Sequence, residues 1–297
     1  MVPLKRLTLL LILLTPNVMT GQQLTNVRRD ILAILDTVQG SFAVAFEDLA
    51  AGSQLMINEK EMFHAASTMK TPVMVELFAQ MRAGSFSLED SIAIRNEFKS
   101  IVDGSVYQLD LKDDSDDSMY KRLGTQCTIR ELVHQMITVS SNLATNILID
   151  LVGAANVTRR MRSIGAADIQ VLRGVEDGKA FERGLNNRTT ALDLLTVMRA
   201  IGNNAAIDAA ASKAMMQILL AQKFNDIIPA LLPPSVKVAH KTGSITGVEH
   251  DSGIVILPDG RRYVLVVLSK NLKDSALGKQ ALARVSKRLY DYMVEGR

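Results

Sequence analysis

The sequence predicts an α/β (α+β) fold, in which an antiparallel sheet built from both ends of the chain is flanked by helices and carries an inserted, mostly helical subdomain. Two observations support this. Strand-like segments lie near both chain ends, and segments with helical periodicity fill the middle. We expect residues 21–297 to form a single domain, with residues 21–62 and 204–297 as the α/β part and residues 63–203 as the helical part.

Each end of the chain contains a predicted β-hairpin. Near the N-terminus, Ser41–Asp48 alternates in part between apolar and polar residues, and an Ala-Gly-Ser turn leads from it into Gln54–Ile57. Near the C-terminus, Gly253–Leu257 and Tyr263–Ser269 are rich in β-branched residues and flank a Pro-Asp-Gly turn. Both hairpins are expected to join one sheet.

Helical spacing of apolar residues marks the elements that surround this sheet. The helices are expected at Thr128–Val139, Leu143–Val152, Thr189–Ile201 and Ser275–Val294. The first of them opens with the capping-box pattern Thr-Ile-Arg-Glu. The acidic run at residues 113–117 is expected to be a solvated loop.

The first twenty residues have the pattern of a secretory signal peptide. Lys5 and Arg6 precede the apolar stretch Leu9–Leu14, which is too short to span a bilayer and is followed by the helix breaker Pro16. We expect residues 1–20 to be removed and the mature protein to be periplasmic or secreted. An uncleaved N-terminal anchor is the alternative.

Composition argues against several classes of partner. The chain has 34 Lys and Arg against 31 Asp and Glu, so its charge gives no indication of nucleic-acid binding. The four histidines are scattered without metal-ligand spacing, and Cys127 is the single cysteine. We expect no metal, no cofactor, no disulfide within the chain and no stable membrane partner. The protein is expected to be a monomer that acts on a small molecule.

The stretch His-Ala-Ala-Ser-Thr-Met-Lys places Ser67 three residues before Lys70. At helical spacing the two side chains share a face, so the amine can reach the hydroxyl. A serine hydroxyl becomes a nucleophile when a neighbouring base removes its proton, and a lysine with a lowered pKa can be that base. Taken alone, the pattern is weak evidence for chemistry, because many helices begin with a capping serine and carry a lysine one turn later.

Two further motifs strengthen the chemical interpretation. Ser140-Ser141-Asn142 lies at the junction of two predicted helices, and Lys241-Thr242-Gly243 precedes the C-terminal strands. Together with Ser67 and Lys70, they occur in the order of the S-x-x-K, S-D-N and K-T-G motifs. The chain therefore resembles class A β-lactamases and penicillin-binding proteins over most of its mature length.

This resemblance implies catalytic roles for the matching residues. Ser67 is expected to be the acylated nucleophile, Lys70 its base, and Ser140 a proton relay to the leaving nitrogen. Asn142 is expected to hydrogen bond to the substrate's side chain. The third motif supplies the remaining substrate contacts: Lys241 and Thr242 for a carboxylate, Gly243 within the motif, and the backbone N–H of Ser244, with that of Ser67, for the oxyanion.

Two positions depart from the family pattern. Ser141 replaces the aspartate of S-D-N, which we expect to affect local packing more than chemistry. His250 follows Lys241 by nine residues, where many class A enzymes carry an arginine that binds the substrate's carboxylate. His250 could do so only when protonated, and a histidine with no substrate role is an equal alternative.

A deacylating base is the feature that separates a β-lactamase from a penicillin-binding protein. Residues 173–190 resemble the Ω-loop of class A enzymes, in which Glu176 is the best match for the base and Glu182 is a rival. The loop is about one residue short. In the family, an early arginine of this loop forms an ion pair with a late aspartate. Here Arg173 matches the arginine, but Asn186 or Asn187 stands where the aspartate is expected.

These observations predict a class A-like serine β-lactamase that hydrolyses the β-lactam amide through a serine acyl-enzyme. The irregular Ω-loop keeps two alternatives open. One is a D-alanyl-D-alanine carboxypeptidase or transpeptidase, and the other is a non-catalytic penicillin-binding sensor.

Overall fold

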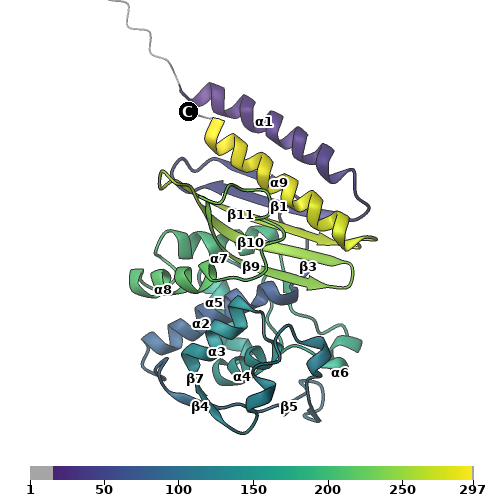
Figure 1. The fold of residues 1–297 in the computed structure, drawn as a ribbon, viewed down its shortest axis with the longest axis vertical. Coiled ribbons are helices and arrows are strands. Elements are labelled where there is room, and N and C mark those ends of the chain that lie inside the picture. Colours follow the sequence, from purple (N-terminus) through teal and green to yellow (C-terminus); the bar gives the residue numbers. More distant parts are fainter. Residues whose placement is uncertain (1–15, 296–297) are drawn as a thin grey trace, which may run out of the picture.

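The computed structural model describes residues 16–295 and has a five-stranded antiparallel sheet at its centre, with helices on both faces (Figure 1). The strand order is β2-β1-β11-β10-β9. The strands are β1 (Ser41–Asp48), β2 (Gln54–Ile57), β9 (Lys237–Ile245), β10 (Val248–Ile256) and β11 (Arg262–Lys270). Both predicted hairpins are confirmed, since β1 pairs with β2 and β10 pairs with β11. Strand β9, which contains the Lys-Thr-Gly motif, extends the sheet beyond the segments that the sequence predicted.

Alternation along the strands divides the sheet between two hydrophobic cores. On β1, Phe42, Val44 and Phe46 face the helices α1 (Pro16–Leu35) and α9 (Ser275–Glu295). Figure 1 shows these two helices, in purple and yellow, side by side over one face of the sheet. Ala43 and Ala45 point to the opposite face and join the core of the helical region. The two chain ends therefore cover the sheet on one side only.

The opposite face of the sheet packs against helices from the middle of the chain. Helices α7 (Ala191–Gly202) and α8 (Ala209–Leu220) contact the strands directly. Although the sequence placed α7 in the helical part, it lies against β1, β10 and β11. A single buried cluster therefore continues from the sheet into the helical region.

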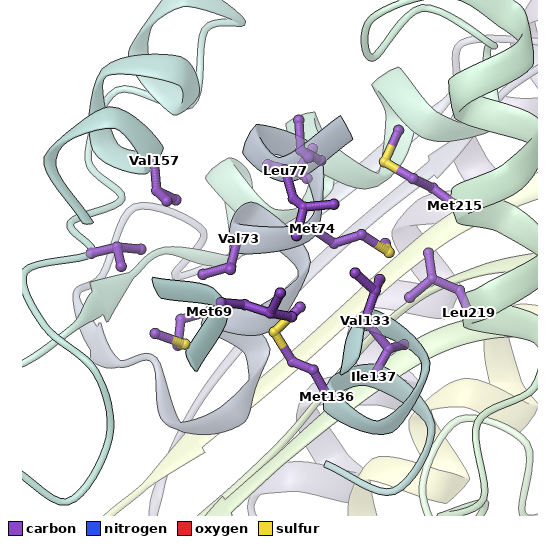
Figure 2. Close-up of a cluster of buried hydrophobic side chains, with 14 of the residues drawn as sticks. Met69, Val73, Met74, Leu77, Val133, Met136, Ile137, Val157, Met215 and Leu219 are labelled. Atoms are coloured by element: carbon purple, nitrogen blue, oxygen red, sulfur yellow. The ribbon is translucent and has the colours of Figure 1, made fainter. Parts of the chain in front are cut away.

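Helix α2 (Lys70–Arg82) lies at the centre of the helical region. It is buried around most of its circumference, as expected for a helix that is apolar on more than one face. Figure 2 shows Met69, which directly precedes this helix, and Met74 and Leu77 of the helix itself. They lie close to side chains of α3 (Ile129–Thr138) and α8, including Met136 and Met215. The start of α2, which carries Lys70, is consequently held firmly in the interior.

The remaining elements are short or surround α2. They are the helices α3 (Ile129–Thr138), α4 (Asn142–Val152), α5 (Ala154–Ser163) and α6 (Gly178–Glu182), the 3₁₀ turns η1 (Ala66–Met69), η2 (Leu111–Asp113) and η3 (Tyr120–Arg122), and the strand pairs β3 (Phe63–His64) with β8 (Arg188–Thr189), β4 (Ser91–Ala93) with β7 (Gln126–Thr128), and β5 (Phe98–Lys99) with β6 (Val106–Tyr107).

The predicted helices are confirmed as α3, α4, α7 and α9, with one difference in capping. Thr128 caps α3, because its hydroxyl accepts the N–H of Glu131 at 3.2 Å. The Glu131 carboxylate pairs with Arg122. It therefore has a tertiary partner in place of the return bond that a capping box predicts.

The expected signal peptide falls mostly outside the described residues. Within them, α1 begins at Pro16 and runs without a break through residue 20, where cleavage was expected. Proline is well tolerated in the first turn of a helix, and Pro16 is the first residue of α1 in the described part of the chain. Between residues 16 and 295, no helix combines the length and apolar character needed to cross a membrane.

Candidate active site

A cleft with two compartments lies where β9 meets the helical region, and Ser67 lines both compartments. The larger compartment, of about 570 Å³, also contains Asn142 and Glu176. The smaller one, of about 210 Å³, contains Ser140 and the motif residues Thr242, Gly243 and Ser244. Lys70 and Lys241 are fully buried beside it. The fold thus brings together residues from all three motifs, which are far apart in the sequence.

Ser67 lies in the tight turn η1, immediately before α2. The preceding Ala66 has a φ of +44°, in the left-handed region, and donates its N–H to His64 Nδ1 at 3.0 Å. Ser67 does not cap the helix, since neither η1 nor α2 has a side-chain cap. Its hydroxyl has no hydrogen-bond partner among residues 16–295, and the residue is partly exposed. The Ser67 hydroxyl is therefore available for chemistry and does not serve as a helix cap.

Lys70 is held by three oxygens from the second motif. Its Nζ donates to the Ser140 carbonyl at 2.6 Å, to Ser140 Oγ at 3.1 Å and to Asn142 Oδ1 at 2.9 Å. Burial lowers the pKa of Lys70 from 10.5 to about 7, while the charges of Asp114 and Glu176 oppose this change. A substantial fraction of this amine is therefore neutral near pH 7 and can accept a proton.

The Ser140 hydroxyl lies between two lysines. Its Oγ is 3.1 Å from Lys70 Nζ and 3.1 Å from Lys241 Nζ. Burial, together with the charge of Lys70, lowers the pKa of Lys241 well below its ordinary value, while Asp251 opposes this. Ser140 has a φ of +59°, a backbone conformation that costs of the order of 1–3 kcal/mol for a residue with a side chain. The surrounding contacts hold this hydroxyl where a proton can pass between the amines and the cleft.

Gly243 allows β9 to approach the nucleophile closely. A Cβ at this position would lie 3.0 Å from the Ser67 nitrogen and 3.1 Å from the Thr68 nitrogen. Only glycine leaves that space free, and Ser67 and Ser244 both line the smaller compartment. Close backbone donors of this kind can stabilise an oxyanion.

Glu176 lies at the mouth of the larger compartment. Its φ is +59°. Although the residue is exposed overall, partial burial of its carboxyl group raises its pKa, and the nearby charge of Asp113 acts in the same direction, while Arg173 and Lys70 oppose it. The rival Glu182 is exposed at the end of α6 and does not line the cleft. Of the two candidates, the fold brings only Glu176 close to Ser67.

Neutral amides hold the base of the loop that carries Glu176. Arg173 donates to Asn186 Oδ1 at 3.0 Å, and the Asn187 side chain bonds to the backbone of Arg173 and Leu172. Hydrogen bonds with both asparagines therefore take the place of the ion pair that the family pattern has here. Burial is the largest influence on the pKa of Arg173 and lowers it. Among residues 16–295, its guanidinium donates to two backbone carbonyls and to Asn186 and forms no ion pair with a carboxylate.

Three residues outside the sequence motifs anchor the middle of this loop. Asn146 of α4 exchanges hydrogen bonds with the backbone of Val175 at 2.7 and 3.0 Å. Tyr107 Oη donates to the Val175 carbonyl at 3.2 Å. Asp177 accepts from Ser100 Oγ at 2.8 Å and from the N–H of Ile101 at 3.0 Å. No local pattern could have identified them, because each acts across 29 or more residues.

His250 is not positioned to bind a substrate, and the interpretation that gave it that role is wrong in this structure. The side chain is fully buried, Nε2 donates to the His64 carbonyl at 2.9 Å and Nδ1 accepts from the N–H of Ser269 at 3.1 Å. Burial lowers its pKa to about 4. The reason is strand alternation: His250 pairs with Gly243, whereas Glu249 pairs with Ser244 and lies on the face that lines the cleft.

Lys279 is a cation at this end of the cleft that sequence reasoning missed. It extends from α9 into the smaller compartment, 2.6 Å from Asp226 and 3.8 Å from Glu249. Glu249 in turn accepts from Ser244 Oγ at 3.1 Å. Helical spacing predicted α9, but it could not show that α9 passes this end of β9 and β10.

The structure shows the roles of Ser141 in the second motif and of the acidic run at residues 113–117. Ser141 is buried and caps α4 through the N–H of Ala144, so its role is local, as expected for this departure. The acidic run is not simply solvated. Asp114 is partly buried and accepts the N–H groups of Asn142 and Leu143 at 2.9 Å. Among residues 16–295, no group of three or more His, Cys, Asp or Glu side chains could hold a metal ion.

Comparison with known proteins agrees with this geometry. The solved structure of a β-lactamase from Sphaerobacter thermophilus is 26% identical, with a TM-score of 0.79, and the match covers 91% of this chain and 98% of that one. The structure of PBP-A is 27% identical with a TM-score of 0.77, covering 91% and 97%. The TLA-1 extended-spectrum β-lactamase, at 20% identity and a TM-score of 0.81 over 92% and 99%, shares the fold.

Sequence comparison leads to the same group. A curated β-lactamase of Bacteroides uniformis is 25% identical over 296 residues, covering 93% of this chain and 94% of that protein. The family model described as the beta-lactamase enzyme family matches residues 26–293, which is nearly the whole described chain. This protein therefore belongs to the β-lactamase enzyme family.

Proposed function

We propose that this protein is a class A-like serine β-lactamase, which hydrolyses the β-lactam amide through an acyl-enzyme on Ser67. The observation that carries the proposal is the buried Lys70 amine, with a pKa lowered to about 7, at the base of the cleft that Ser67 lines. Family membership supports β-lactam as the substrate class. Burial keeps this amine partly neutral, and the oxygens that accept its hydrogen bonds fix its position.

Acylation requires a proton to leave the serine and another to reach the leaving nitrogen. Lys70 Nζ takes the proton of Ser67 Oγ as the oxygen attacks the β-lactam carbonyl. The N–H groups of Ser67 and Ser244 receive the developing oxyanion. When the carbon–nitrogen bond breaks, Ser140 Oγ, 3.1 Å from Lys70 Nζ, passes a proton to the nitrogen and is reprotonated from the lysine.

Deacylation requires a water and a base. Glu176 lines the same compartment as Ser67, and its raised pKa makes it a stronger proton acceptor than an ordinary glutamate. In the proposed step, water attacks the ester carbonyl and its proton passes to Glu176. The carbon–oxygen bond to Ser67 then breaks, and the proton held by Glu176 returns to Ser67 Oγ.

A second candidate is a penicillin-binding peptidase that stays acylated. The likeness to PBP-A and the amide-held base of the 173–187 loop favour it. A leucine-to-glutamate variant of PBP-A has been solved as an acyl-enzyme complex with penicillin G, and it is 26% identical to this chain with a TM-score of 0.78. The presence of Glu176 in the cleft favours hydrolysis over this alternative. A non-catalytic sensor would not need a buried lysine amine with a lowered pKa, so the Lys70 site counts against that alternative.

The test is intact-protein mass spectrometry during incubation with a simple penicillin, with antibiotic consumption followed in parallel. We expect a transient adduct in the unchanged protein, none in Ser67→Ala, and a persistent adduct in Glu176→Gln. Glu182→Gln is the matched control and should turn over normally. A persistent adduct on the unchanged protein would indicate the penicillin-binding alternative, and normal turnover by Glu176→Gln would exclude this base.

We also propose that the protein acts outside the cytoplasm, where its N-terminal residues would direct it. Support comes from Lys5 and Arg6 ahead of Leu9–Leu14, a pattern typical of export signals. N-terminal sequencing of the secreted or periplasmic form would test this, and finding residue 1 intact in a cytoplasmic fraction would refute it.

A further inference from the structure

We propose that Asp114 is a positioning residue of this site: its carboxylate comes from a separate loop, fixes the start of α4, and so holds the Ser140 and Asn142 oxygens on Lys70 while placing a negative charge beside that amine. The inference rests on the proposed acylation of Ser67. It concerns a residue outside all three motifs.

The carboxylate of Asp114 occupies the N-terminus of α4. Asn142 N lies 2.9 Å from both Asp114 oxygens, and Leu143 N lies 2.9 Å from Oδ2. Tyr120 Oη donates to Oδ2 at 3.1 Å and holds the carboxylate from its other side. The first N–H groups of a helix have no partner within the helix, and they favour a negative charge. This carboxylate therefore binds the helix start directly.

The same helix start carries the oxygens that hold Lys70. Asn142 Oδ1 accepts from Lys70 Nζ at 2.9 Å, and its Nδ2 donates to the Asp113 carbonyl at 3.0 Å. The acidic loop thus grips Asn142 through both its backbone and its side chain. Ser140, two residues earlier, has a left-handed backbone that needs outside contacts to persist. A shift of residues 140–143 would move all three oxygens bonded to Lys70.

Asp114 also compensates for the change at position 141. The family motif has an aspartate there, and an aspartate at a helix N-cap accepts N–H groups of the first turn. Ser141 caps only the N–H of Ala144, at 3.3 Å, and brings no charge. Asp114 supplies a carboxylate to the two preceding N–H groups, those of Asn142 and Leu143. The carboxylate at the start of α4 therefore comes from a loop more than 25 residues away in the sequence, and not from position 141 of the motif.

The charged groups that face Lys70 are Asp114 from this loop, Glu176 from the 173–187 loop and Lys241 from β9. Asp114 and Glu176 favour the protonated amine, whereas burial disfavours it. Removing the charge of Asp114 alone should therefore make Lys70 easier to deprotonate, even as the loss of its hydrogen bonds loosens the site.

The experiment uses the full protein and compares Asp114→Ala, Asp114→Asn and the double variant Asp114→Ala/Ser141→Asp. Asp117→Ala is the matched control, because Asp117 lies in the same acidic run and pairs only with the exposed Lys121. The rate constant for adduct formation with a penicillin is measured per folded molecule. The pKa of Lys70 is measured separately by carbon-13 NMR of labelled lysine, with no substrate present.

We expect Asp114→Ala to slow acylation by about 10- to 100-fold. The added Ser141→Asp should recover most of that loss, and Asp117→Ala should stay within about twofold of the unchanged protein. In Asp114→Asn the Lys70 pKa should fall by about 1. If Asp114 were merely structural, its substitution would lower the yield of folded protein without changing the Lys70 pKa. A carboxylate at position 141 would then not restore the acylation rate.

Three results would overturn the inference: acylation by Asp114→Ala within about threefold of the unchanged protein, a loss that Ser141→Asp does not recover, or an unmoved Lys70 pKa in Asp114→Asn. If the unchanged protein forms no adduct at all, the proposed function fails. The NMR titration then decides the role of Asp114 by itself, since it needs no substrate.

Discussion

Replacing His250 with glutamine removes a titratable group from the interior of the protein, beside the nucleophile's turn. The ring packs edge-on against Phe63, with centroids 6.0 Å apart, and both of its nitrogens bond to backbone groups of His64 and Ser269. Because burial lowers its pKa, this ring stays neutral in the folded protein at pH values where an unfolded chain would protonate it.

The size of the effect follows from the two pKa values. The pKa of His250 falls from 6.5 to about 4 on folding. Each tenfold change in proton affinity corresponds to about 1.4 kcal/mol, so the group accounts for about 3 kcal/mol. The unfolded state binds the extra proton between these pH values. Stability is therefore fully present above pH 6.5 and is lost as the pH falls towards 4.

Urea unfolding followed by circular dichroism, from about pH 7.5 to about pH 4, measures this contribution. Glutamine keeps a donor for the His64 carbonyl but leaves the N–H of Ser269 unpaired, which should cost about 1–3 kcal/mol at neutral pH. At the acidic end the unchanged protein should lose about 3 kcal/mol that the variant does not lose, so the variant should become as stable as the unchanged protein or more stable. His134→Gln, at an exposed position of α3, is the control.

A stability difference between His250→Gln and the unchanged protein that stays constant with pH would refute this reasoning. It would mean that folding leaves the His250 pKa unchanged, so that the folded protein protonates His250 as readily as the unfolded chain does. The substrate-binding role rejected above would then have to be reconsidered. The accompanying expectation is that KM for a penicillin shows no dependence on His250 ionisation near pH 6.5.

Three further changes test the cleft. Gly243→Ala should lower the acylation rate by about tenfold or more, because the new Cβ would lie 3.0 Å from the backbone nitrogen of Ser67. Gly178→Ala is the control, because no atom beyond its local backbone lies within 4 Å of its new Cβ, and its acylation rate should not change. Equal acylation rates in the two variants would contradict the close approach at Gly243. Asn186→Asp gives Arg173 a carboxylate partner and should raise the free energy of unfolding by about 1 kcal/mol. Hydrogen exchange over residues 173–187 should also become slower. A lower melting temperature in this variant would contradict the expected ion pair. Lys279→Ala should raise KM for an anionic penicillin several-fold at low salt with little change in kcat, and an unchanged KM would remove Lys279 from substrate attraction.

Local sequence was enough to predict most of the elements and the chemical groups of the site. The two hairpins and four helices depend on period-two and period-3.6 patterns that can be recognised within ten to twenty residues. Ser67 and Lys70 could be paired for the same reason, since three residues of helix place them on one face. The motif around Lys241 was recognisable, although the strand that contains it was not expected.

What the sequence could not decide is the direction in which side chains point and the partners they find across the fold. His250 has the right spacing from Lys241, yet strand register turns it into the interior and brings Glu249 and the distant Lys279 to the cleft. Asp114 looked like one of several solvated acids, yet it binds the start of α4. By itself, the sequence determined which reactive groups are present. Only the tertiary structure decided which of them meet, because contacts between residues 28 or more positions apart depend on how the sheet and helices pack and leave no local periodic signal.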